Sequence, residues 1–114
     1  FNLFNSIFTS KCYSNRVFAE PLRKLILKMS QELVSGVVIF CVPQLSDFST
    51  NSTSRVALFD SIHHPNLAIF DLQDPIKYAL RDSPPHKLYV NRSYGGHLNK
   101  YGNAIVSKII ASYL

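Results

Sequence analysis

The chain has little of what metal sites, membrane spans and nucleic-acid surfaces require. Its 2 cysteines, Cys12 and Cys41, are too few and too far apart for a metal site, and a thiol in an apolar run like that around Cys41 usually packs. The longest apolar run, Val37–Val42, is too short to cross a membrane. The net charge of +5 comes from dispersed residues that form no basic block, so we expect no nucleic-acid partner.

What is present is typical of one small folded domain. The chain has 114 residues, of which 46% are hydrophobic and 17% charged, and at this length a three-layer α/β sandwich would be short of strands. Phe1 stands in place of an initiator Met, and no basic segment with an apolar core follows it, so we expect the natural N-terminus to lie upstream. We therefore interpret residues 1–114 as a single partial domain.

The first half of the chain predicts a helix followed by a buried strand. Residues 1–17 have no clear period and receive no element. From Phe18 to Leu33 apolar residues recur at steps of three and four, which predicts an amphipathic helix with Pro21 in its first turn and Gly36 in the C′ position. The β-rich run from Val37 to Pro43 then indicates a strand buried on both faces of a parallel sheet.

The second half continues the α/β alternation. We expect polar turns over 44–54, a short helix over 55–62, a second strand at Leu67–Asp71, and a helix capped by Asp74 that runs to about Arg81. A short edge strand over 87–91, a loop over 92–99 and a C-terminal helix capped by Asn99 complete the chain. Two parallel strands need neighbours, so this predicts an α/β fold with a parallel sheet whose N-terminal strands are missing.

The best candidate for a functional residue is His97. In open α/β sheets the ligand crevice lies beyond the carboxyl ends of the strands, which singles out Pro43-Gln44, Asp71 to Asp74 and the 92–99 loop. Gly95 and Gly96 allow a positive φ and leave the His97 imidazole unshielded, while Asn99 fixes the loop to the next helix. A histidine held in this way suits proton transfer near neutral pH.

The segment Gly-His97-Leu-Asn99-Lys-Tyr-Gly102-Asn103, followed by an apolar helix, resembles the last sequence block of the SGNH/GDSL hydrolases. There the histidine is followed two residues later by a small polar residue and five residues later by glycine. The strands ending in Pro43 and Asp71 are similar to the C-terminal half of that family's domain, and the resemblance covers roughly residues 18–114.

The resemblance implies a flavodoxin-like three-layer αβα fold and an ester hydrolase or acyl transferase with a serine nucleophile. It implies that His97 is the general base, and we expect Tyr94, Gly95 and Gly96 beside it to bind substrate. The substrate would be a small-molecule, carbohydrate or lipid ester, and no cofactor or metal is implied.

This chain also departs from the family pattern. The family usually has an Asp three residues before the histidine, where this chain has Tyr94, whose hydroxyl carries no charge at neutral pH. Either the enzyme works as a Ser-His dyad, or Asp71 or Asp74 substitutes, or the activity is lost.

The family also has an oxyanion hole, formed by the amide of its nucleophilic serine with a Gly and an Asn. Neither that serine nor these oxyanion donors have a counterpart in this chain. Phe59-Asp60-Ser61 echoes the family's Gly-Asp-Ser, but it lacks the glycine and lies on a predicted helix too near His97. We therefore expect the chain to be inactive by itself.

Two other classes of function stay open. One is a non-catalytic binding or surface-assembly domain that retains the SGNH scaffold, and the other is a response-regulator-like module that uses Asp71 and Asp74. The adjacent His63 and His64 do not suggest a metal site, because neighbouring side chains face apart and no third ligand has suitable spacing. His86 has no partner that the sequence can identify.

Overall fold

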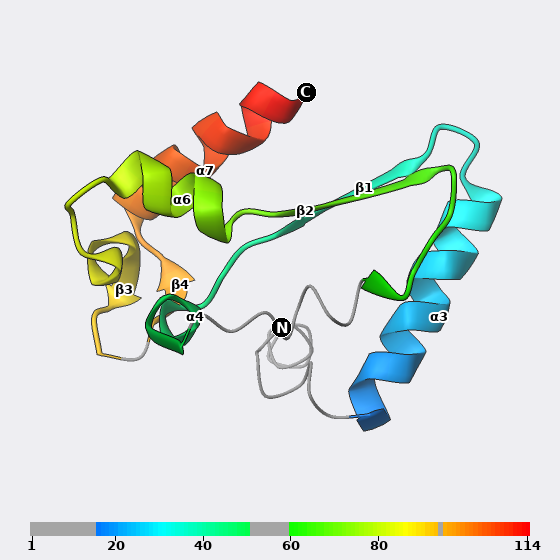
Figure 1. Ribbon diagram of the computed structural model, residues 1–114, viewed down its shortest axis with the longest axis horizontal. Coiled ribbons are helices and arrows are strands. Elements are labelled where there is room, and N and C mark those ends of the chain that lie inside the picture. Colours follow the sequence, from blue (N-terminus) through cyan, green and yellow to red (C-terminus); the bar gives the residue numbers. More distant parts are fainter. Residues whose placement is uncertain (1–15, 51–59, 94) are drawn as a thin grey trace. The chain divides into compact units, whose positions relative to one another are not determined.

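The structure is a computed structural model that describes residues 16–50, 60–93 and 95–114 (Figure 1). It is a mixed α/β structure, and no helix within those ranges is long and apolar enough to span a membrane. Its elements in chain order are α3 (Arg16–Glu32), β1 (Val37–Cys41), α4 (Leu45–Thr50), β2 (Leu67–Asp71), α6 (Gln73–Leu80), the 3-10 helix η1 (Pro85–Leu88), β3 (Tyr89–Asn91), β4 (Gly95–Leu98) and α7 (Lys100–Tyr113).

The chain divides into two compact units, which are described separately. The N-terminal unit comprises Phe1–Ile39 and Thr53–Phe70, and the C-terminal unit comprises Phe40–Ser52 and Asp71–Leu114. Strands β1 and β2 each begin in the first unit and end in the second.

In the N-terminal unit, α3 confirms the predicted amphipathic helix but differs from the prediction at both ends. It begins at Arg16, so Pro21 lies inside the helix and not in its first turn. It ends at Glu32, well before Gly36, so the predicted C′ role of this glycine is wrong. Gly36 instead has a φ of +85° in the turn that leads into β1, where its N–H donates to the carbonyl oxygen of Leu33 at 3.1 Å.

The apolar stripe of α3 is buried only in part. Ile26 is buried, and the hydroxyl of the fully buried Ser30 donates to the Ile26 carbonyl oxygen at 2.8 Å. Leu25, Met29 and Leu33 remain exposed, although the periodicity predicts that they face inward.

Strands β1 and β2 form a two-stranded parallel sheet. At one end Val37 N donates to Asn66 O at 2.7 Å, and at the other Leu72 N donates to Cys41 O at 3.0 Å. The predicted bounds of β2 are confirmed, while β1 ends at Cys41, two residues before the predicted Pro43. Most residues of both strands are half-buried, so the predicted burial on both faces is wrong for the described residues. The side chain of Cys41, at the end of β1, is buried.

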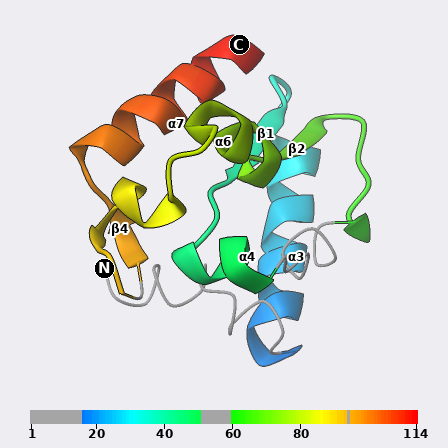
Figure 2. The ribbon, with the colours of Figure 1, turned by 60° about the vertical axis from the view of Figure 1, so that its left-hand side comes forward.

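The C-terminal unit has a well-packed apolar core. Helices α6 and α7 pack against each other, and η1 packs against α7 (Figure 2). The rings of Phe40 and Tyr113 lie 5.8 Å apart between centroids. Burial of the apolar side chains of the core is the main favourable term in holding the unit together. The buried apolar residues of this unit are Cys41, Leu72, Ile76, Leu80, Leu88, Tyr89 and Val106.

The sequence predicts turns over the whole polar stretch 44–54, and this is wrong for residues 45–50, which form the helix α4. The backbone N–H of Gln44 donates to the Asp47 carboxylate at 2.7 Å, and Asp47 N donates to Gln44 O at 3.0 Å. This reciprocal pair resembles a capping box and satisfies N–H groups at the start of the helix. Residues 51–59 lie outside the described ranges, as does most of the helix predicted over 55–62.

Helix α6 begins two residues earlier than its predicted cap allows. Its N-cap position is Leu72, which makes no side-chain cap, and Asp74 lies exposed in the first turn, so the N-cap role predicted for Asp74 is wrong. The carboxylate of Asp71 instead accepts from Gln73 N at 3.0 Å. The carboxylate that accepts from a backbone N–H at the start of α6 is therefore that of Asp71, where the sequence predicts Asp74.

Candidate functional site

His97 lies on β4, which pairs antiparallel with β3. The predicted loop over 92–99 is therefore wrong in its second half. Tyr89 pairs with Leu98 and Asn91 pairs with Gly95, with a register shift between the two pairs. That shift sets Gly96 and His97 together opposite Val90, which is the two-against-one arrangement of a β-bulge. Bulges are common beside active sites because they redirect a side chain, and here the redirected residue is an exposed histidine.

The two glycines before His97 have different roles. Gly95 and Gly96 have φ values of +82° and +98°, which side chains disfavour. A Cβ on buried Gly95 would lie 2.7 Å from the Leu45 Cβ, so this glycine is required by close packing. Among the described residues, a Cβ on Gly96 would meet nothing within 4 Å. Gly96 is therefore bordered by open space, and the His97 side chain that follows it is exposed. Tyr94, the third predicted substrate-binding residue, lies outside the described residues.

The hairpin of β3 and β4 is fixed to the segment that follows β1. The buried Tyr89 hydroxyl donates to the Pro43 carbonyl oxygen at 2.6 Å. On the other strand, Gly95 packs on Leu45. Both contacts place the His97 hairpin at the carboxyl end of β1, which is the edge where open α/β sheets bind ligands.

Asn99 fixes the other side of His97. Its side-chain oxygen accepts from Gly102 N at 2.8 Å, which confirms the predicted N-cap of α7. The amide nitrogen of the same side chain donates to the carbonyl oxygen of Lys87 at 2.7 Å, and its backbone N–H donates to Leu88 O at 2.8 Å. One residue therefore joins β4, α7 and η1, two positions after the histidine.

Among the described residues of the C-terminal unit, no carboxylate pairs with His97. Between residues that it describes, an ion pair joins Arg23 and Glu20, and none joins His97 to Asp71 or Asp74. Asp71 accepts from the Gln73 backbone, and Asp74 is exposed on α6. The His97 ring also has no hydrogen bond to any described residue. Neither aspartate holds the position of a triad acid in this unit.

The other histidines and the Asp60-Ser61 pair lie elsewhere. In the N-terminal unit, His64 Nδ1 accepts from Asn66 N at 3.1 Å, and His63, Asp60 and Ser61 are exposed. Within the described ranges, no three His, Cys, Asp or Glu side chains are grouped so that they could hold a metal ion. Because it accepts the hydrogen bond from Asn66 N, the ring of His64 stabilises the turn before β2.

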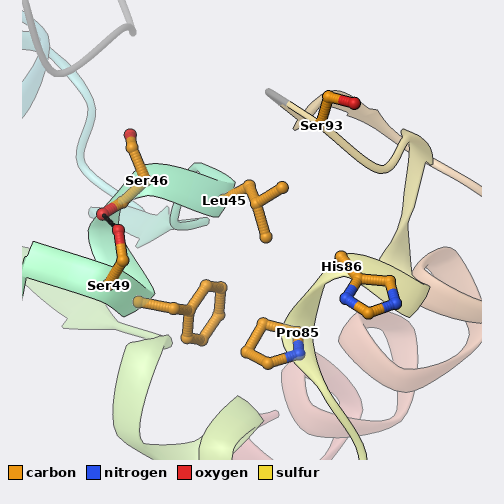
Figure 3. A pocket seen from close by; sticks show the side chains of 7 residues that line it. Leu45, Ser46, Ser49, Pro85, His86 and Ser93 are labelled. Atoms are coloured by element: carbon orange, nitrogen blue, oxygen red, sulfur yellow. Dashed lines mark hydrogen bonds between the residues drawn. The ribbon is translucent and has the colours of Figure 1, made fainter.

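A pocket that the sequence did not indicate lies in the C-terminal unit (Figure 3). Its volume is about 670 Å³. Side chains of α4 form one wall, η1 forms the opposite wall, and Ser93 in the hairpin turn stands at the rim. These segments are distant in the sequence, so no local motif could have revealed the pocket. Its lining residues are Leu45, Ser46, Phe48, Ser49, Pro85, His86 and Ser93.

No family model, curated protein or solved structure matches this chain. What supports a function is therefore the resemblance of its last sequence block together with the geometry of the C-terminal unit.

Proposed function

We propose that the chain is the C-terminal part of an SGNH/GDSL-like ester hydrolase or acyl transferase in which His97 is the general base. Its fold in the intact protein is then the flavodoxin-like three-layer sandwich of that family, to which α6, α7 and the parallel strand pair contribute. The serine nucleophile and the oxyanion donors come from other parts of the intact polypeptide.

The observation that carries this proposal is the placement of His97. The imidazole is exposed on a β-bulge, and the bulge is fixed by Gly95 against Leu45 on one side and by the Asn99 cap on the other. A general base must be reachable by the substrate and held by rigid neighbours, and this arrangement meets both requirements.

The chemistry assigned to His97 is proton transfer in two half-reactions. A ring nitrogen takes the proton of the serine hydroxyl as its oxygen attacks the ester carbonyl, and then gives that proton to the departing alcohol. In the second half-reaction the ring removes a proton from water, or from an acceptor hydroxyl, as it attacks the acyl-enzyme. The proton then returns to the serine.

The test compares His97→Ala with His63→Ala in the intact parent polypeptide. Hydrolysis of p-nitrophenyl acetate should fall by about 10⁴-fold in kcat for His97→Ala, because loss of the base disables the serine. His63 is exposed and makes none of the contacts that fix the His97 hairpin, so His63→Ala should retain the parental rate. An unchanged rate in His97→Ala would exclude the general-base role, and hydrolysis by the 114-residue chain alone would exclude an external serine.

A non-catalytic binding domain on the same scaffold is the second candidate. It is favoured by the absence, among the described residues, of any carboxylate or carbonyl bonded to the His97 ring. A catalytic imidazole usually has such an orienting partner. Covalent labelling separates the two candidates, because a fluorophosphonate should modify a serine of the parent enzyme and should leave a non-catalytic parent unmodified.

A further inference from the structure

The pocket beside the His97 hairpin has its own chemistry. Its lining combines three exposed serines with one half-buried imidazole and three half-buried apolar side chains. In Figure 3, Ser46 and Ser49 lie on α4, across the space from Pro85 and His86 on η1. The volume of about 670 Å³ falls within the range of small-molecule sites.

The polar groups of this pocket are able to pair with a ligand. Ser49 donates its hydroxyl proton to Ser46 O at 2.9 Å, which leaves its oxygen free to accept. Among the residues that the structure describes, none hydrogen-bonds to the ring of His86 or to the hydroxyl of Ser93. A neutral imidazole offers one donor and one acceptor, and a serine hydroxyl offers both functions.

The composition of the lining selects one class of ligand. Among the residues that the structure describes, it contains no lysine, arginine, aspartate or glutamate, so these offer no counter-charge to a phosphate, a carboxylate or an ammonium group. A fatty chain would cover the His86 ring and the Ser93 hydroxyl without giving them hydrogen-bond partners, which is costly. A neutral, hydroxyl-rich ligand pairs with these groups and can lay its C–H face on Phe48 and Pro85.

We propose that this pocket binds a carbohydrate, as a neutral mono- or oligosaccharide. The site does not depend on the chemistry of His97, although the two are adjacent: Leu45 lines the pocket and also packs beneath Gly95 of β4. If the proposed ester chemistry also holds, the sugar is the part of the substrate that carries the acylated hydroxyl.

The experiment is an NMR titration of the 114-residue chain labelled with ¹³C in its 4 histidine rings. Maltose should shift the His86 signal in a saturable way, with a dissociation constant of about 1 mM, because an open pocket leaves part of the ligand in water. The His63 and His64 signals should stay in place. Hexanol, which represents an apolar chain, and inorganic phosphate, which represents an anion, are titrated separately for comparison.

Two variants locate the binding. Ser93→Ala should weaken maltose binding about fivefold, the loss of one hydrogen bond, and Phe48→Ala should weaken it about tenfold. Ser107→Ala, on an exposed position of α7, is the matched control and should bind like the parent. Ser93 is exposed in a turn, so its variant tests the site even if Phe48→Ala fails to fold.

The titration also separates this proposal from the function of His97. His97→Ala should leave maltose binding unchanged, whatever it does to ester hydrolysis. The proposal is overturned if maltose leaves the His86 signal in place, if hexanol or phosphate shifts it while maltose does not, or if Ser93→Ala binds maltose as tightly as the parent.

Discussion

The two units of the chain bury apolar side chains to different extents. In the C-terminal unit, Leu72 and Leu88 are 0% exposed and Tyr89 is 2% exposed. In the N-terminal unit, Leu25 on α3 is 54% exposed and Leu33, just after its last residue, is 44% exposed. Burial of apolar surface is the main source of stability, so the unit that carries His97 and the pocket holds its own geometry, while α3 contributes less per residue.

The difference between the two units is tested most directly by the same Leu→Ala substitution in each of them. Leu88→Ala should lower the free energy of unfolding by about 2 to 5 kcal/mol, because it leaves a cavity beneath α7. Leu33→Ala removes the same atoms from an exposed position and should change it by less than about 0.5 kcal/mol. Urea unfolding followed by circular dichroism measures both. Equal losses of stability in the two variants would contradict the placement of Leu88 in a buried core and of Leu33 at the surface.

A smaller effect is expected where α7 crosses η1. The Cβ of Gly102→Ala would collide with the Leu88 carbonyl oxygen and lie 3.0 Å from Leu98 Cδ2. Alanine favours a helix over glycine by about 1 kcal/mol, but backbone displacement by overpacking costs about 1 to 3 kcal/mol, so the clash should win.

Asn103→Ala, at the next and exposed position of α7, is the control for Gly102→Ala and should leave stability unchanged or slightly higher. Amide hydrogen exchange should show weaker protection of α7 in the glycine variant alone. Stabilisation by Gly102→Ala would show that α7 lies further from η1.

Elements with local signals were predictable from the sequence. The run from Leu67 to Asp71 is apolar and follows Pro65-Asn66, and Asn99 precedes an apolar-periodic helix, so both were placed correctly. Helix α4 was missed because its N-terminal bonds come from a Gln and an Asp, and glutamine is not a usual cap. Asp74 was misassigned because the parallel pairing of Leu72 with Cys41 sets where α6 begins.

The site was also predictable only in part, because some of its features depend on contacts that no local sequence signal shows. The exposure of His97 follows from its neighbouring glycines, which the sequence shows. Its position on a bulge depends on the register of the β3–β4 hairpin, and the need for glycine at Gly95 depends on contact with Leu45, which is distant in the sequence. Strand β4 has the sequence Gly-Gly-His-Leu, whose glycines disfavour a strand by themselves.

The smallest expected effect concerns one buried hydrogen bond that fixes the His97 hairpin. Tyr89→Phe removes the hydroxyl that donates to Pro43 O, and leaves that buried carbonyl without this donor, which should cost about 1 kcal/mol. Tyr101→Phe, 49% exposed on α7, should cost almost nothing. Urea unfolding gives both values, and amide exchange of β3 and β4 should increase in the first variant alone. If the two variants match, Tyr89 does not hold the hairpin to the end of β1, and the placement of His97 at that edge loses its main support.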